Sequence, residues 1–405
     1  MTGDVFVGVD IGTTFIKAVV YDAAFAVHGH RKVRTPWQQV STGGEADPEA
    51  IVAAVLMAVT DAVQAADVRR VAAIGVTGMG EAGVLVDGHD RPLAPVIAWH
   101  DRRGHDQAER LLRDVPGFIE AAGRPPSHVC SLVKWRYLAD QGLDLTRVRR
   151  WYALAEWVVH RLGGAPESEG SLASRTGALD VRTGELDAAA LAWVGARPEW
   201  FGQIVAAGRP GGVAAVGPDA LRGCTTTVAG LDGYASAVGV GADTPEVAFL
   251  SCGTSGAAIR MVGAGLDDAA MRRAAAMDFT LDRWLDGEHL VMLGATPCGL
   301  ILQPLHDVLG PPALGGAPGV GAALDPAALW RRAFDAVADG QVRLVRDIER
   351  LGPAVTRVVA AGGWIAQAGL RDAIERRVGG RLTVVADENT AACGAAMLAR
   401  SAIQS

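Results

Sequence analysis

Alternation of hydrophobic and polar residues opens the chain and then gives way to helical spacing. Apolar side chains occupy every second position over residues 5–9, a polar turn follows at residues 12–14, and the alternation resumes over residues 16–20. An Asp-Pro pair at residues 47–48 has the form of a helix N-cap with proline in the first turn, and apolar residues then recur every fourth position up to residue 63. The pattern predicts a strand, a tight turn and a second strand, with a helix that covers their sheet.

The middle of the chain alternates short apolar segments with longer helical ones. Residues 71–76 and 84–86 predict two strands that end in polar loops, and residues 106–163 have a mainly helical pattern. Residues 165–217 are rich in glycine, proline and small side chains, from which we expect cleft walls and surface loops.

The plan of the N-terminal segment recurs after residue 230. A strand, a Gly-Thr turn and a second strand over residues 247–261 repeat the order found about 240 residues earlier. This weak internal duplication indicates two similar α/β lobes, which we place at residues 1–226 and 227–405. The other elements expected in the second lobe are a loop at 310–321, a helix at 326–350, strands at 355–361 and 382–385, and a terminal helix from residue 390.

Composition and charge narrow the class of protein. Half of the 405 residues are hydrophobic and 20% are charged, which is typical of a globular chain with about two to three domains. The net charge is −7 and no basic run is present, so we expect no nucleic-acid partner. The start lacks a signal-peptide pattern and no apolar run approaches the ~20 residues of a membrane span, so we expect a cytoplasmic protein without a membrane partner. The five cysteines are scattered, which argues against a disulfide framework and a zinc site.

Two Gly-Thr turns, one in each predicted lobe, are candidate phosphate sites. A polyphosphate needs several backbone N–H groups that converge on it; glycine permits the close approach, and threonine or serine adds hydroxyl donors. A single turn of this kind is weak evidence, because hairpins use glycine widely. Two turns, each flanked by strands, indicate a nucleotide held between the lobes. The donor candidates are Gly12, Thr13, Thr14, Gly253, Thr254 and Ser255.

Six segments, taken in order, resemble a known family. They read GVDIGTTFIKAVVYD, GVTGMGEAGVLVDGHDRPLAPVIAWHDRRG, VAGLDGYASAVGVGA, FLSCGTSGAAI, VVAAGGWIAQ and ENTAACGAAMLA. Their order and spacing are similar to the phosphate, sugar, catalytic and adenosine segments of the FGGY carbohydrate kinases, which include glycerol kinase, xylulokinase and gluconokinase. The resemblance implies a two-lobed α/β fold of the actin/Hsp70-like (ribonuclease H-like) ATPase type with a central cleft. It also implies phosphorylation of a hydroxyl group of a small sugar, ketose, polyol or aldonic acid, with ATP and Mg²⁺ as cofactors.

Two aspartates and a lysine are the candidate groups for this chemistry, which needs a carboxylate for the hydroxyl proton and a cation for the phosphates. Asp232 lies in a glycine-rich loop before a helix of small residues; the residues alone fit a helix cap as well, and the resemblance makes it the general base. Asp10 ends the first strand and is the candidate for Mg²⁺, through water, with a turn-capping role as the alternative. Lys17 either reaches a phosphate or lies on a strand edge, and Gly362 and Gly363 match the adenosine-site glycines of the family.

The acceptor site is expected mainly in the second of the six segments. A sugar site needs planar polar groups for adjacent hydroxyls and an aromatic ring for C–H faces. Glu81, Trp99 and Asp101 supply such side chains, and Gly80 and Asp232 complete the predicted acceptor site. The alternative for Trp99 is ordinary packing.

Departures from the family pattern leave the substrate open. Glycerol kinase has Arg-Glu and xylulokinase has Met-His where this chain has Gly80 and Glu81, and relatives often have glutamine or asparagine where it has Gly233. The chain is also shorter than most of the family, and the shortening falls in the second half. A homodimer is one expectation for its assembly.

Two alternatives stay open at this point. An actin-like or Hsp70-like ATPase without a sugar substrate would share both phosphate turns but would not need the acceptor residues or Asp232. A dinucleotide-binding oxidoreductase could use the Gly-Val-Gly triplet at residues 239–241, but that triplet follows a predicted helix rather than a strand.

Overall fold

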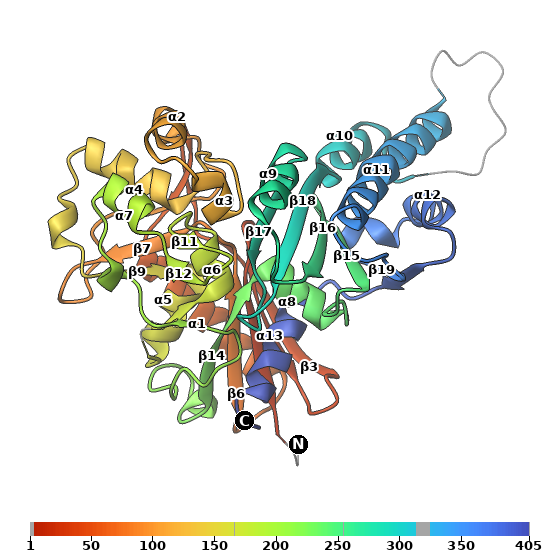
Figure 1. Cartoon of the computed structure of the whole chain (residues 1–405). Helices are drawn as coiled ribbons and strands as arrows, with labels where there is room; N and C mark the ends of the chain where they lie inside the picture. The colour runs from red at the N-terminus through yellow and green to blue at the C-terminus, as the bar shows by residue number, and fades with distance from the viewer. Residues whose placement is uncertain (1–3, 166, 254, 313–324, 405) are drawn as a thin grey trace.

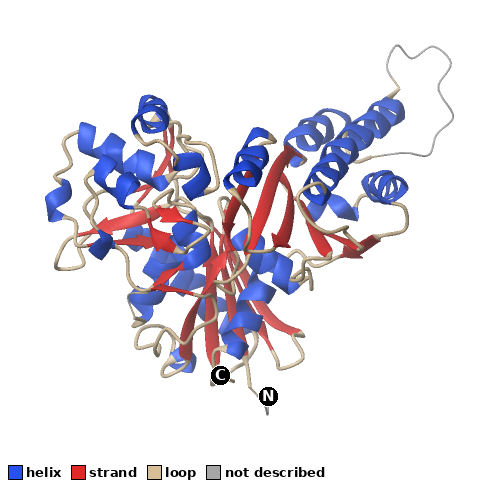
Figure 2. Ribbon diagram, viewed as in Figure 1, coloured by secondary structure: helices blue, strands red, loops and turns tan. Residues whose placement is uncertain are grey.

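A five-stranded sheet joins segments that are far apart in the chain. The computed structural model describes residues 4–165, 167–253, 255–312 and 325–404, and Figures 1 and 2 show its helices and strands. The strands of the first sheet, in spatial order, are β14 (Thr225–Leu231), β6 (Ala73–Gly78), β1 (Phe6–Ile11), β2 (Phe15–Tyr21) and β3 (Val27–Arg34). As predicted, β1 and β2 pair antiparallel, whereas β6 and β14 run parallel to β1.

Helices cover both faces of the first sheet because its strands alternate. Val7 is buried with the apolar stripe of α1 (Pro48–Ala65), whereas its neighbour Phe6 packs with α13 (Thr390–Ser401) on the opposite face. Each face of β1 therefore meets its own helix.

The cap predicted for α1 is confirmed. The Asp47 side chain accepts a hydrogen bond from the Glu49 backbone N–H at 3.0 Å, and the stripe that recurs every fourth residue is buried. By length and apolar composition α1 would also suit a membrane span, but here half of that window is buried inside the protein.

Glycine lets α13 lie directly on the first sheet and on α8 (Asp232–Gly239). A Cβ atom on Gly8 of β1 would lie 1.8 Å from the Ala392 carbonyl oxygen of α13, and one on Gly394 would lie 1.8 Å from the Ala235 carbonyl oxygen of α8. No real contact is that short, so only glycine fits at these crossings. Figure 1 shows α13 beside β6, and the helix contacts both β1 and β6 although it is the last helix of the described chain.

The second sheet repeats the local plan of the first. Its strands, in spatial order, are β17 (Phe279–Arg283), β18 (Leu290–Pro297), β16 (Ser255–Val262), β15 (Val247–Cys252), β19 (Arg357–Ala361) and β20 (Leu382–Val385). β15 pairs antiparallel with β16 and parallel with β19, as β1 does with β2 and β6, so the duplication predicted from the sequence is confirmed at the level of strand pairing. The helices that contact this sheet include α9 (Asp268–Ala276), α10 (Gly299–Leu309), α11 (Pro326–Glu349) and α12 (Ala368–Val378).

The predicted boundary between residues 226 and 227 does not coincide with a division between the sheets. It falls inside β14, which pairs with β6 in the first sheet, and α13 returns to the same sheet. A local hydrophobic pattern shows that a strand is present but not which distant strand it joins, so the boundary could not be placed from the pattern.

The stretch at 106–163 is mainly helical, as predicted, and it also includes β9 (Arg150–Ala153), which pairs with β7 (Gly83–Val86). The stretch at 165–217 combines loops with short elements, among them the fully buried α6 (Gly170–Ser174), whose small side chains allow close packing. Most of the loop predicted at 310–321 lies outside the described residues. The remaining elements are β4 (Gln38–Val40), β5 (Gly43–Ala46), β8 (Val96–Ile97), β10 (Ser168–Glu169), β11 (Leu179–Asp180), β12 (Glu185–Leu186), β13 (Ile204–Val205), α2 (His105–Asp114), α3 (Phe118–Ala122), α4 (Ser131–Asp140), α5 (Leu154–Leu162), α7 (Ala188–Val194) and the 3₁₀ turns η1 (Leu145–Arg147), η2 (Pro198–Trp200), η3 (Asp219–Leu221) and η4 (Gly363–Ala366).

Candidate active site

Three parallel strands of the first sheet end at one edge, and each delivers an acidic side chain there. Asp10 lies near the end of β1, Glu81 follows β6 and Asp232 follows β14. Asp10 pairs in register with Thr77 of β6, whose hydroxyl donates to the Gly230 carbonyl oxygen of β14 at 2.6 Å. Because parallel sheets bind ligands beyond the carboxyl ends of their strands, this edge is the expected place for a site.

Asp10 is a buried carboxylate with an unpaired oxygen. Its Oδ1 atom accepts no hydrogen bond from the described residues. Burial and, next, the negative charge of Asp232 raise the pKa of Asp10 to about 7, against the opposing effect of Lys17. A buried, unpaired carboxylate oxygen beside a second carboxylate is suited to a cation.

Asp232 is half-buried rather than freely exposed. It is the first residue of α8, the N-cap being Leu231, and its Oδ1 atom accepts a hydrogen bond from the Gly233 backbone N–H at 2.7 Å. Burial raises the pKa of Asp232, and the Gly233 hydrogen bond opposes that shift. The carboxylate is therefore at the edge of the sheet and is a better proton acceptor than one in water.

Hydrogen bonds to its carbonyl oxygens fix the first Gly-Thr turn. The Gly12 carbonyl accepts from the Thr35 hydroxyl at 2.7 Å, and the Thr13 carbonyl accepts from the Trp37 indole N–H at 2.7 Å. The backbone N–H groups of Thr13 and Thr14 donate no hydrogen bond within the described residues. Free N–H groups on a turn with anchored carbonyls are the arrangement that an anionic ligand needs.

The second Gly-Thr turn joins β15 to β16. The Gly253 carbonyl accepts a hydrogen bond from the Gly299 N–H at 3.0 Å, and Ser255 is exposed at the start of β16. Thr254 lies outside the described residues.

Gly362 and Gly363 lie beside this turn, because β19 runs parallel to β15. Gly362 has a φ of +115°, and a Cβ atom there would lie 2.8 Å from the Cys252 carbonyl group, so only glycine fits. A Cβ on Gly363 would meet nothing within 4 Å. The glycine pair thus gives a close backbone contact on one side and open space on the other, which suits the predicted adenosine site.

Lys17 is tied to the C-terminal part of the chain. Its Nζ atom donates to the Glu388 carbonyl oxygen at 2.8 Å. Neither alternative predicted from the sequence describes this contact, and binding of a phosphate by Lys17 stays a prediction.

Glu81 is held by two arginines in a strained conformation. Its φ of +59° lies in the left-handed region, which is rare for residues other than glycine. Its Oε1 atom pairs with Arg175 and accepts from Arg124 at 3.2 Å, and its backbone carbonyl accepts from the Ser131 hydroxyl at 3.0 Å. Gly80 is buried against Arg175. These contacts fix the loop at residues 79–82, which we call the acceptor loop.

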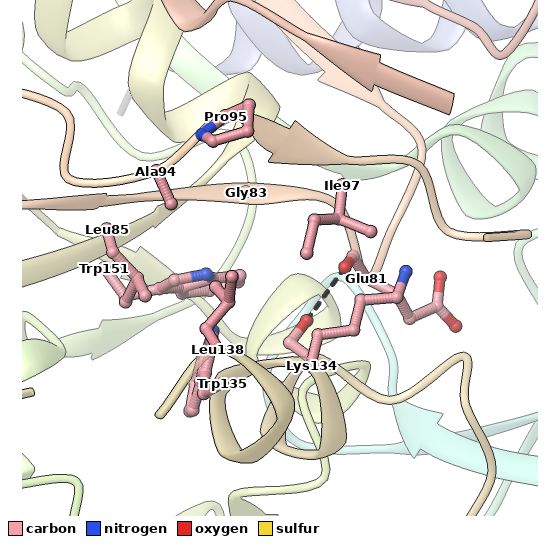
Figure 3. A pocket seen from close by; sticks show the side chains of 11 residues that line it. Glu81, Gly83, Leu85, Ala94, Pro95, Ile97, Lys134, Trp135, Leu138 and Trp151 are labelled. Atoms are coloured by element: carbon pink, nitrogen blue, oxygen red, sulfur yellow. Dashed lines mark hydrogen bonds between the residues drawn. The ribbon is translucent and has the colours of Figure 1, made fainter. Parts of the chain in front are cut away.

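A small cavity lies behind this loop (Figure 3). Its volume of about 20 Å³ has room for about one water molecule, not for a sugar. The Glu81 carboxylate points away from Trp135 and Trp151, which line the cavity. The buried Lys134 donates to the carbonyl oxygens of residues 98–99 at 2.6 and 3.1 Å, and burial lowers the pKa of Lys134 to about 8. Lys134 thus supports the acceptor segment from inside.

Trp99 connects the acceptor segment to the first phosphate turn. Its indole Nε1 donates to the Thr13 hydroxyl at 2.8 Å. Trp99 is half-buried, so one part of the ring packs while another remains accessible. Packing and substrate contact, which the sequence left as alternatives, are compatible here.

Asp101 has a structural set of partners. It is fully buried, and its two oxygens accept from the Arg103 guanidinium and backbone, from the Thr42 hydroxyl and from the Gly44 N–H. Although burial alone would raise it, the hydrogen bonds from Arg103 lower the pKa of Asp101 to about 2. These contacts give Asp101 a role in holding the segment, and its contact with a sugar stays a prediction that this geometry does not favour.

The charged residues that support the site were missed in the sequence. Arg124, Lys134 and Arg175 are almost fully buried. A lone cation in a sequence usually lies at the surface, so none of the three could be recognised as buried. The fold supplies their partners, which are Glu81 for the two arginines and the carbonyl oxygens of residues 98–99 for Lys134.

Comparison with known families gives a match over more than half of the chain. The profile of the N-terminal domain of the FGGY family of carbohydrate kinases matches residues 5–239. This range contains Asp10, Glu81 and Asp232 together with the first phosphate turn.

Curated relatives carry several substrate names. The xylulose kinase of Streptomyces rubiginosus is 29% identical over 268 residues, which cover 63% of this chain and 53% of that protein. The glycerol kinase of Thermococcus kodakarensis is 31% identical over 176 residues, which cover 41% of this chain and 35% of that protein. The matched region thus spans about half or less of the length of these relatives.

Solved structures match the whole fold. The crystal structure of xylulose kinase from Rhodospirillum rubrum has a TM-score of 0.85 and 21% sequence identity, and the match covers 98% of this chain and 89% of that one. The two-lobed architecture is thereby shown.

Proposed function

The chain belongs to the FGGY family of carbohydrate kinases, and from that premise we propose that it transfers the γ-phosphoryl group of ATP to a hydroxyl group of a small sugar, ketose, polyol or aldonic acid. The observation that carries the proposal is the meeting of Asp10, Glu81 and Asp232 at one sheet edge. In the adjoining turn, the N–H groups of Thr13 and Thr14 donate to no described residue and are available for phosphate oxygens.

Asp232 is the proposed general base. The acceptor hydroxyl oxygen forms the new bond to the γ-phosphorus, its proton passes to the Asp232 carboxylate, and the bond to the leaving ADP oxygen breaks. Burial supports this role because it raises the pKa of Asp232 and so its affinity for a proton. Glu81 and Trp99 are the proposed acceptor contacts, the first for hydroxyl groups and the second for C–H faces.

Asp10 is the proposed residue for Mg²⁺. Its buried and unpaired Oδ1 atom fits a cation, and the described residues contain no cluster of three or more potential metal ligands. That combination suits an ion held by one or two carboxylates, water and the substrate phosphates. When bound, Mg²⁺ would neutralise charge on the phosphate oxygens.

The second turn and the glycine pair at residues 362–363 are the proposed nucleotide contacts from the other sheet. A nucleotide held by turns from both sheets would place its terminal phosphate between them, at the edge that carries Asp232. A homodimer and a cytoplasmic location stay predictions from the sequence.

Replacement of Asp232 by asparagine tests the proposal. We expect ATP-dependent phosphorylation to fall by about 10²–10⁴-fold, the usual contribution of a general base, with ATP affinity changed less than threefold. ADP release would be measured with a panel of pentuloses, hexuloses, tetritols, pentitols, glycerol and aldonic acids. The matched control is Asp219→Asn, because the Asp219 side chain is 97% exposed.

The same assay separates the alternative of an actin-like or Hsp70-like ATPase. ATP turnover by the unmodified protein that no compound in the panel stimulates would favour that alternative. Stimulated turnover that survives in the Asp232→Asn protein at more than a third of the original rate would remove Asp232 from the proton transfer.

A further inference from the structure

A buried chain of charged and polar groups links the acceptor loop to the second sheet. One Arg175 nitrogen pairs with Glu81, and another donates to the Asp282 carboxylate at 2.9 Å and to the Thr280 hydroxyl at 3.1 Å. The same Asp282 oxygen accepts a hydrogen bond from the Tyr234 hydroxyl. Asp282 is fully buried, and Glu81 and Arg175 are 5% and 8% exposed.

This network of side chains connects the three elements that phosphoryl transfer must bring into register. Glu81 belongs to the acceptor loop, Asp282 lies in β17 of the second sheet, and Tyr234 lies in α8, two residues after the proposed base Asp232. Arg175 is the one described residue that pairs with both Glu81 and Asp282.

Packing places Arg175 at this junction independently of its ion pairs. A Cβ atom on Gly80 would lie 2.8 Å from the Arg175 Cγ and 2.9 Å from the Leu231 Cδ1. The arginine stem thus lies against the acceptor loop, next to the residue that precedes Asp232. A side chain at position 80 would displace it.

Stability alone gives no reason for such a network. Burial of an ion costs several kcal/mol, and apolar residues of similar volume often stabilise a protein as well as a buried ion pair does. A network of hydrogen-bonded charges does, however, fix geometry, and Glu81 needs fixing because its left-handed backbone conformation is strained. The role of the network is therefore to hold these side chains in position.

The two arginines leave one oxygen of Glu81 available. Arg124 and Arg175 both contact Oε1. In contrast, Oε2 accepts no hydrogen bond from the described residues and is not fully buried. A carboxylate anchored through one oxygen presents the other in a fixed direction. That free oxygen can accept a hydrogen bond from a hydroxyl group of an acceptor.

We propose that Arg175 is a positioning residue: it orients the free oxygen of Glu81 toward a polyhydroxylated acceptor and, through Asp282 and Tyr234, holds the helix of Asp232 in register with the second sheet. The proposal rests on the function proposed above. It assigns the two ends of the network different effects, because the Glu81 end acts on acceptor binding and the Tyr234 end acts on the rate of transfer.

Steady-state kinetics of two conservative variants test this division. Arg175→Lys keeps one charge but cannot span both carboxylates, so the acceptor KM should rise at least tenfold while the KM for ATP changes less than threefold. Tyr234→Phe removes only the hydroxyl, so kcat should fall at least fivefold while the acceptor KM changes less than threefold. The matched control is Arg182→Lys, since Arg182 also bridges to the second half, through Asp268, but does so at the surface.

The outcomes are separable. An acceptor KM in Arg175→Lys within threefold of the unmodified protein, or equal changes of KM for both substrates, would overturn the proposal. If Arg175→Lys does not fold, the Tyr234→Phe variant decides, and an unchanged kcat in it overturns the proposal. Failure of the proposed function would instead appear in the unmodified protein, as ATP turnover that no acceptor stimulates.

Discussion

The crossing of α13 and α8 allows a perturbation whose size can be worked out from the structure. A Cβ atom on Gly394 would lie 1.8 Å from the Ala235 carbonyl oxygen, and ordinary contact begins at 3.4 Å. Gly394→Ala therefore requires the two helices to separate by about 1.6 Å. The blocking atom is backbone, so no side-chain rotation relieves the contact.

The energetic and catalytic effects of this separation should both be large. Alanine improves helix propensity by about 1 kcal/mol relative to glycine, whereas overpacking costs about 1–3 kcal/mol or more. The difference is a loss of stability of up to about 2 kcal/mol, and we expect the upper end because the blocking atom is backbone. Because α8 begins at Asp232, a shift of more than 1 Å would also misplace the proposed base, which can cost about 10²-fold in rate.

Thermal unfolding and phosphorylation kinetics measure these effects together. We expect Gly394→Ala to lower both Tm and kcat, whereas Gly263→Ala should change neither, since a Cβ atom on Gly263 meets nothing within 4 Å. A Gly394→Ala protein with the Tm and kcat of the unmodified chain would refute the close crossing. A lowered Tm with unchanged kcat would show that the helix shift does not reach Asp232.

Two further substitutions test the buried carboxylates. Asp101→Asn removes the buried charge that Arg103 contacts, although Glu45 still pairs with Arg103, and should destabilise the protein by about 1–3 kcal/mol in urea unfolding; a raised acceptor KM with unchanged stability would instead make Asp101 a substrate ligand. Burial raises the pKa of Glu156 to about 8, above the ~4.3 of an unfolded glutamate. Between these values the folded state holds the extra proton, so Glu156 by itself makes the free energy of unfolding fall by about 1.4 kcal/mol per pH unit as pH rises. Glu156→Gln should remove this contribution between pH 5.5 and 7.5, and equal slopes in the two proteins would contradict the buried, protonated Glu156.

Local patterns predicted the elements of this fold but not all of their partners. The strands on either side of the turn at residues 12–14 could be placed because alternation and turn chemistry are encoded within a few residues. The pairing of β14 with β6 could not, because nothing in either strand identifies its neighbour in the sheet. For the same reason α13 could be predicted as a helix but not as a layer on the first sheet.

The candidate site divides in the same way. Asp10 and Asp232 could be singled out because each lies where an apolar strand ends, and the edge of a parallel sheet collects such positions. Arg175 and Asp282 could not be singled out, because their role depends on a contact between residues 107 positions apart in the sequence. A buried ion pair is visible only when both partners have been placed.

The acceptor segment lies between two fixed structures, which explains why the substrate is the least predictable part of the site. On one side Trp99 bonds to the first phosphate turn, and on the other Arg175 ties Glu81 to the second sheet. The two predicted phosphate turns would bind the nucleotide, which is the same for every acceptor, so they carry no information about the substrate. Gly80 packs against Arg175, Glu81 pairs with it, and both are predicted to face the acceptor, so a different pair there would change the predicted pocket and the anchoring of the loop together. A substrate name therefore cannot be transferred from relatives that have other residues at these positions.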